Sequence, residues 1–194
     1  MRTRALWMMC GAQLCGSLGA QSASFHWVPH FGQVGFNPVT VATMLSVYTM
    51  AAAFSAGMWG FLSERFSERM LAMITMSCGF CLVLSMMLAD NVVWAMVTVG
   101  LFGLSSRGET AMFSLVLARF FGRESFGRIA GVVHPFGAVG ASLAPLLGGV
   151  IFDMTGHYSA LYGTLAVVYV TAFTCLLLAA DPQKNLPPVA EPTA

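Results

Sequence analysis

Hydrophobic residues follow one another along this chain in long runs, and short polar stretches separate the runs. The longest uncharged region is the clearest, since no Asp, Glu, Lys or Arg occurs between Arg4 and Glu64. A run of about 20 uncharged apolar residues is long enough for a helix to cross the hydrocarbon core of a bilayer. The pattern predicts six transmembrane helices, over residues 5–28, 39–62, 69–89, 92–118, 129–152 and 158–180.

Turn-forming residues between the runs support these boundaries. Asn37-Pro38 suits a helix cap followed by proline in the first turn, Asn91 can cap the fourth helix, and Gly156 suits a helix C-terminus. The charged stretch 60–69 is so short that the helices on its two sides are expected to be antiparallel neighbours.

The composition excludes a soluble globular domain. Hydrophobic residues make up 57% of the chain and charged residues 9%, whereas soluble domains carry roughly 25% charged residues. We therefore predict an all-α, multi-pass integral membrane protein whose surroundings are the lipid bilayer, with no nucleic acid as a partner.

The cysteines do not indicate a metal site. Cys78-x-x-Cys81 has the spacing of a ligand pair, but no second pair or nearby histidine accompanies it, and structural zinc takes about four ligands. Cysteines in apolar runs usually pack as small apolar residues. We expect neither a metal nor a cofactor. All five cysteines lie within predicted helices: Cys10, Cys15, Cys78, Cys81 and Cys175.

Apart from Arg107, basic residues occur only in alternate connections. They lie before the first predicted helix, between the second and third, between the fourth and fifth, and after the sixth, at Arg2, Arg4, Arg65, Arg69, Arg119, Arg123, Arg128 and Lys184. The positive-inside rule then predicts that both termini are cytoplasmic, in a plasma or inner membrane. The expected domains are a cytoplasmic stub over 1–4, a six-helix transmembrane domain over 5–180 and a polar, Pro-rich, disordered cytoplasmic tail over 181–194.

The first run could instead be a secretory signal. Ala20-Gln21-Ser22-Ala23 resembles a small-residue cleavage site, and arginines precede the run. However, the apolar character continues through Trp27, and Gln13 interrupts the supposed signal core. A retained helix is the favoured interpretation.

Two charged residues lie near the middle of the fourth predicted helix. Arg107 and Glu109 point to nearly opposite sides at about 100° per residue, so they do not simply neutralise each other. A charge in the membrane is costly unless it faces a partner, a cavity or a substrate. One interpretation is a structural ion pair with a neighbouring helix. The other, which we favour for one of the two, is binding of an ionic substrate or transfer of a proton.

Other helices offer polar companions for these charges. Gln13, Ser17, Gln21 and Ser24 form one narrow stripe on the first predicted helix, which suits the wall of a water-filled cavity. His134, beside Pro135 on the fifth, is a further candidate for the substrate or proton pathway, although a packing role is the more common one for a single histidine.

Small residues recur every fourth position on the fifth predicted helix, which indicates a seam for close packing. Such seams let helices approach each other in lipid, where burial of apolar surface gives no driving force between them. Pro135 and Pro145 also weaken the backbone hydrogen bonds, which favours bending. The predicted seam consists of Gly137, Ala141, Pro145 and Gly149.

Three stretches together resemble the major facilitator superfamily. GFLSERFSER at 60–69 resembles its short cytoplasmic signature loop. ARFFGRESFGRIAG at 118–131 and the run from Gly131 to Tyr158 are similar to the loop between the tenth and eleventh helices and to the following helix. Those two matches resemble the monocarboxylate-porter and oxalate–formate antiporter-like branch. Glu109 resembles the acidic position that precedes this loop in related members.

The resemblance implies an architecture and a partner. Family members have twelve helices in two halves with the substrate between them, and the motifs here match the C-terminal half. A second six-helix half, either a missing N-terminal half or a partner chain, is therefore expected. In the signature loop, Ser67 replaces a glycine and Glu68 a basic residue, while Glu64 stands for the acid that helps to close the cytoplasmic side. The gate-loop candidates are Gly60, Glu64, Arg65 and Arg69.

The function implied is secondary transport of a small organic anion, such as a monocarboxylate, by alternating access. Arg107 would attract the carboxylate, and Glu109 could couple a proton. The alternative is a truncated or regulatory membrane protein that only associates with partner helices. We do not expect an enzyme, because Ser142 lacks a suitably placed base and His134 lies two turns away on the same helix.

Overall fold

The computed structural model describes residues 2–122 and 125–179, without the side chains of residues 2, 3 and 107. Within those ranges the chain is entirely helical and has no strand. The proposed tail over 181–194 and the basic residues Arg123 and Lys184 lie outside the described residues. The helices are α1 (Arg2–Val34), α2 (Pro38–Ser63), α3 (Glu68–Met87), α4 (Val92–Phe121), α5 (Phe126–Thr155) and α6 (Ser159–Leu178).

The helix ends use the predicted turn residues. The Asn37 side chain accepts a hydrogen bond from the Val39 N–H at 2.9 Å, with Pro38 at the first helical position. The Asn91 side chain caps α4 in the same way, through the Trp94 N–H at 2.8 Å. Gly156, with φ +76°, ends α5 in the left-handed conformation that glycine adopts without strain.

The first helix is longer at both ends than its predicted span. It begins at Arg2, within the residues expected to form a stub, and continues past Pro29 to Val34. A proline normally interrupts a helix because it lacks an N–H. Here the residues that follow it, His30 and Phe31, are buried against the bundle. Tertiary packing therefore maintains the helix beyond the proline.

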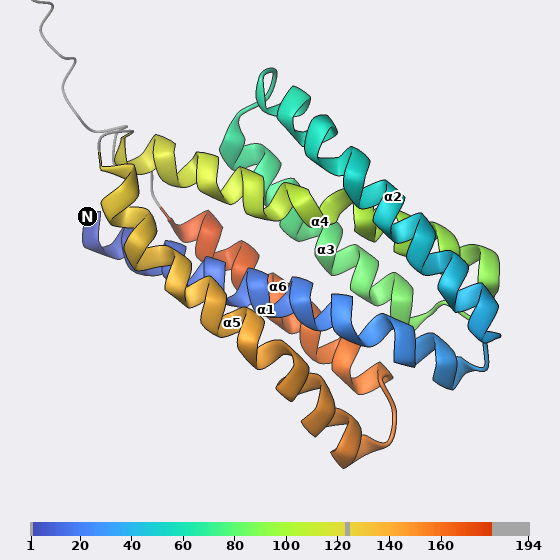
Figure 1. Cartoon of the computed structure of the whole chain (residues 1–194). Helices are drawn as coiled ribbons and strands as arrows, with labels where there is room; N and C mark the ends of the chain where they lie inside the picture. The colour runs from blue at the N-terminus through green and yellow to red at the C-terminus, as the bar shows by residue number, and fades with distance from the viewer. Residues whose placement is uncertain (1, 123–124, 180–194) are drawn as a thin grey trace, which may run out of the picture.

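The helices pack in two equivalent groups (Figure 1). α1 packs mainly on α5 and α6, α4 packs mainly on α2 and α3, and α3 also contacts α6. Exchanging α1 with α4, α2 with α5, and α3 with α6 leaves this set of contacts unchanged. The bundle is therefore built from two similar three-helix units, α1–α3 and α4–α6, and the helices of one unit pack mainly against those of the other. Such an arrangement is found in transporters with internal repeats.

The helices on the two sides of the short charged turn are not close neighbours, contrary to the sequence-based expectation. α2 and α3 make few contacts with each other, because α4 packs along both of them. In Figure 1 the two helices meet at their turn, and α4 runs beside them. A short connection determines where two helices meet, but the helix that fills the space between them determines what each packs against.

Within residues 2–122 and 125–179, four helices are long and apolar enough, by length and composition, to cross a membrane. They are α2, α3, α5 and α6. α1 and α4 run beside them but carry more polar residues, among them Gln13, Gln21, Arg107 and Glu109. That these two helices also span the bilayer, and that the termini are cytoplasmic, stay predictions.

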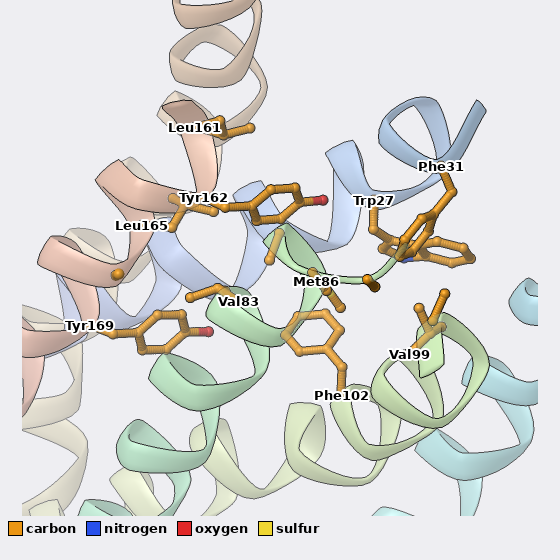
Figure 2. Close-up of a cluster of buried hydrophobic side chains, with 14 of the residues drawn as sticks. Trp27, Phe31, Val83, Met86, Val99, Phe102, Leu161, Tyr162, Leu165 and Tyr169 are labelled. Carbon is orange, nitrogen blue, oxygen red and sulfur yellow. The ribbon is translucent and has the colours of Figure 1, made fainter. Parts of the chain in front are cut away.

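Buried side chains form two clusters. In the first, Trp27 and Phe31 of α1 lie near Met86 of α3 and Phe102 of α4, and Tyr162 enters from α6 (Figure 2). The second contains Trp59, Phe113, Phe120 and Leu176, with Met9 of α1. α1, α2, α3, α4 and α6 contribute buried residues to both clusters, although much of the surface of α2 and α5 remains exposed.

The Tyr162 hydroxyl is buried and finds no hydrogen-bond partner among the described residues. An unsatisfied buried hydroxyl costs about 1–3 kcal/mol. We therefore expect Tyr162→Phe to raise the free energy of unfolding by about 1 kcal/mol, measured by thermal denaturation in a mild detergent. Tyr158→Phe is the control, because the Tyr158 ring is half-buried and stacks on Phe152. A less stable Tyr162→Phe protein would mean that the hydroxyl is satisfied.

Candidate functional site

A polar hollow of about 270 Å³ lies between α1, α2 and α4. Its wall combines hydroxyl groups, an amide and one carboxylate, which is unusual in a bundle whose other surfaces are mostly apolar. Such a set of groups can hydrogen-bond a polar solute or water. The lining residues are Ser17, Ala20, Gln21 and Ser24 of α1, Tyr48 of α2, and Ser106, Glu109 and Thr110 of α4.

Glu109 is the charged residue among these lining residues, and its carboxylate lies against α1. A Cβ atom added at Gly16 would be 2.5 Å from Glu109 Oε1, so a larger residue at this position would displace the carboxylate from its present place. A carboxylate inside a membrane bundle is costly unless it has a function or a partner. The packing thus holds Glu109 between the backbone of α1 and the hollow.

The polar stripe predicted on α1 faces the hollow along most of its length. Ser17, Gln21 and Ser24 are part of the wall. Gln13 is outside the lining and connects to it, because its Nε2 donates to Ser17 Oγ at 3.3 Å. Three of the predicted pathway residues, Ser17, Gln21 and Glu109, therefore lie together at one site.

The other two pathway candidates are His134 and Arg107. His134 is exposed on α5 and does not line the hollow. The backbone of Arg107 lies in α4, two residues before Glu109, but its side chain is outside the described part of the structure.

Three polar lining residues were not predicted: Tyr48, Ser106 and Thr110. Tyr48 is a single tyrosine in an apolar helix, and its position gives no sequence signal for the side it faces. Ser106 lies three residues before Glu109, so helical spacing could have indicated it once Glu109 was chosen as the centre, whereas Thr110 directly follows Glu109 and that spacing does not indicate it.

The charged turn contains an ion pair that involves Glu68 rather than Glu64. Arg119 Nη1 donates to Glu68 Oε2 at 2.7 Å, which connects α4 to the start of α3. The Arg69 Nη2 group donates to the Leu177 carbonyl at 2.9 Å, near the end of α6. Both charges of the pair are partly exposed, so the pair contributes at most about 1 kcal/mol to stability.

The remaining gate-loop candidates make no such connections among the described residues. Glu64 and Arg65 are exposed, and the Arg65 guanidinium lies over its own neighbour, the Phe61 ring, 4.5 Å from the centroid. Gly60 is exposed with open space where a side chain would lie. Within this chain, Glu68 and Arg69 link the turn to other helices, and the role inferred for Glu64 has no contact that supports it.

The packing seam on α5 shares Gly137 with the predicted row and otherwise lies beside it. Ala141 and Gly149 are half-buried and Pro145 is exposed, so these three residues do not face α1 closely. From residue 137 onward, the buried small residues of α5 are Gly137, Gly140, Ala144 and Gly148.

These four residues, the contact row of α5, lie directly against α1. A Cβ atom at Gly140 would overlap the Leu14 carbonyl oxygen, and one at Gly148 would overlap the His26 ring. Ser22 Oγ donates to the Ala144 carbonyl at 3.2 Å. Close approach here places the backbones of α1 and α5 in contact, as small residues permit in membrane helices.

Comparison with known proteins identifies the family of this chain. The family profile of the Major Facilitator Superfamily matches residues 7–193. An uncharacterized MFS-type transporter of Schizosaccharomyces pombe is 23% identical over 160 residues, which are 78% of this chain and 35% of that protein. The chain thus matches about a third of the length of this relative. With nearly all of its sequence matched, and with its apolar helices, the chain belongs to the Major Facilitator Superfamily as a multi-pass integral membrane protein.

Proposed function

We propose that the chain is one six-helix half of a secondary transporter that moves a small organic anion by alternating access. Membership of the superfamily and similarity to an MFS-type transporter support the transporter class. The choice of an organic anion as the substrate, with a monocarboxylate first, is based on two features. They are Arg107 in α4 and the resemblance of residues 118–158 to the monocarboxylate-porter-like branch.

The observation that carries the proposal is the position of Glu109 on the wall of the polar hollow. An ionisable group inside a membrane helix is by default a functional one, and hydroxyls from α1, α2 and α4 surround it. We assign proton coupling to Glu109 and attraction of the substrate carboxylate to Arg107. The hollow would then be one wall of the transport pathway.

The opposite wall must come from a second six-helix unit. α2 and α5 expose large apolar side chains, including Met50, Phe54, Val139 and Leu146. Lipid covers such residues on one side of the bundle. We propose that a second half covers those that flank the hollow. This half belongs either to the same protein or to a partner chain. The arginine-bearing turns and both termini are then cytoplasmic, in the plasma or inner membrane.

Uptake into proteoliposomes tests this proposal. With the chain reconstituted together with its second six-helix half, we expect saturable uptake of radiolabelled lactate or oxalate that increases with an inward proton gradient. Glu109→Gln should abolish the dependence on the gradient, and Arg107→Ala should lower uptake at least tenfold, as expected for loss of a charge-assisted hydrogen bond of about 1.5–3 kcal/mol. Asp90→Asn is the control, because Asp90 is exposed and does not line the hollow. Equal gradient-driven uptake by Glu109→Gln and the unchanged protein would reject the role of Glu109.

A second candidate is a regulatory protein that associates with partner helices without transport. The large exposed apolar surfaces of α2 and α5 favour it. Native mass spectrometry in detergent separates the two. A strictly monomeric chain that shows no uptake would exclude transport by paired copies.

A further inference from the structure

Two side chains of α2 donate to the same carbonyl of α4. Ser55 Oγ lies 2.6 Å from the Leu104 oxygen, and Trp59 Nε1 lies 2.8 Å from it. Both residues are buried, with relative exposures of 0% for Ser55 and 4% for Trp59. In a regular helix this carbonyl also accepts from the N–H four residues later, that of Gly108. The turn from Leu104 to Gly108 is therefore anchored to α2 by two hydrogen bonds in addition to its own.

The indole of Trp59 also occupies the space beside Gly108. A Cβ atom at Gly108 would overlap the indole ring, so glycine is required for the ring to lie there. Trp59 itself does not line the hollow, whereas Ser106, Glu109 and Thr110 do. The ring thus contacts α4 next to Glu109, on the side of the helix away from the hollow.

On its other side, the Glu109 carboxylate meets Gly16 of α1. The turn that carries Glu109 is held between an indole of α2 and a glycine of α1. Each residue turns an α-helix by about 100°, so a modest rotation of α4 would take the carboxylate away from the hollow. Contacts with Trp59 and Ser55 oppose that rotation.

We propose that Trp59 is a positioning residue for Glu109. Its N–H and ring, together with Ser55, set the rotation of α4 so that the carboxylate faces the hollow. The functional part of this inference rests on the proposed function of Glu109 in transport. The geometric part does not, and it has its own measurement.

The measurement is chemical labelling of Glu109 by dicyclohexylcarbodiimide in the full chain, with Glu64 of the same molecule as the internal reference. Mass spectrometry gives the ratio of the two labelling rates. Trp59→Phe keeps an aromatic ring and removes the N–H, and we expect the ratio to fall about threefold, as for the loss of one hydrogen bond. Ser55→Ala should lower it in the same direction, and Gly108→Ala should lower it more because it displaces the ring.

Trp94→Phe is the matched control. Its indole N–H donates to Ser85 Oγ at 2.8 Å, so this variant also loses one indole hydrogen bond, but away from Glu109. The ratio should not change in Trp94→Phe. Thermal denaturation identifies any variant that is unfolded, and Ser55→Ala, the smallest change, keeps the test valid if Trp59→Phe does not fold.

The outcomes separate this inference from the proposed function. An unchanged labelling ratio in folded Trp59→Phe and Ser55→Ala proteins would overturn the positioning role, even if Glu109→Gln abolished coupling. A lowered ratio together with fully coupled uptake by Glu109→Gln would reject the proposed function and leave the positioning role intact. If Trp94→Phe lowered the ratio equally, the effect would be general, and the positioning role would be rejected.

Discussion

Gly140→Ala is expected to lower the free energy of unfolding by about 2 kcal/mol or more, because overpacking a close contact costs about 1–3 kcal/mol. The added Cβ atom would overlap the Leu14 carbonyl oxygen, which belongs to the backbone of α1 and has no side-chain rotation to relieve the contact. The two helices must then separate along the contact row of α5. Thermal denaturation in a mild detergent, followed by circular dichroism, measures the change.

Gly149→Ala is the matched control on the same helix. No atom lies within 4 Å of the site of its Cβ, and alanine favours a helix by up to about 1 kcal/mol over glycine. We expect its stability to be unchanged or slightly higher. The comparison distinguishes the two rows of small residues on α5. Equal destabilisation by Gly140→Ala and Gly149→Ala would contradict the contact row seen here.

Gly103→Ala is expected to have a comparable effect at the other close crossing, between α4 and α2. Its Cβ atom would lie 2.5 Å from the Tyr48 carbonyl oxygen and 3.0 Å from Ala51 Cβ. A loss of about 2 kcal/mol is expected from overpacking, and the shift of α2 also moves Tyr48, which lines the hollow. Both denaturation and substrate uptake should therefore respond.

Gly57→Ala provides the comparison for this crossing. It replaces a glycine of α2 that has no neighbouring atom within 4 Å of the Cβ site. Its stability and uptake should match those of the unchanged protein. If Gly103→Ala were as stable as Gly57→Ala, the close backbone approach of α2 and α4 would not exist in the folded protein.

Much of the helical architecture could be predicted from local features. Charge-free runs of membrane length give the helices, because every backbone polar group in lipid must be satisfied within the segment. Asn37 and Asn91 begin helices because their side chains cap the first turn. Gly156 ends a helix because its backbone adopts the left-handed conformation. The continuation of α1 past Pro29 could not be predicted, since packing by His30 and Phe31 outweighs the missing N–H.

The candidate site was predicted only in part. Glu109 and the α1 stripe could be found because polar groups in an apolar helix are costly and therefore conspicuous. Tyr48 could not be found, because a single tyrosine has no periodic partner. Glu68 departs from the signature of the 60–69 loop, but the position of Arg119 makes it the acid of the ion pair.

The linear order of residues was sufficient to establish the all-helical membrane class, the positions of the helices and the residues at which a buried charge or amide demanded an explanation. These are local properties of hydrophobicity, charge and turn chemistry. Which row of small residues on α5 meets α1, which helix separates α2 from α3, and which side of α4 faces the hollow depend on contacts between distant segments. Those contacts follow from the shapes of all six helices packed together. Gly148 and Gly149 illustrate the reason, since α5 offers two similar small rows and only the fit of Gly140 against Leu14 and of Gly148 against His26 selects between them.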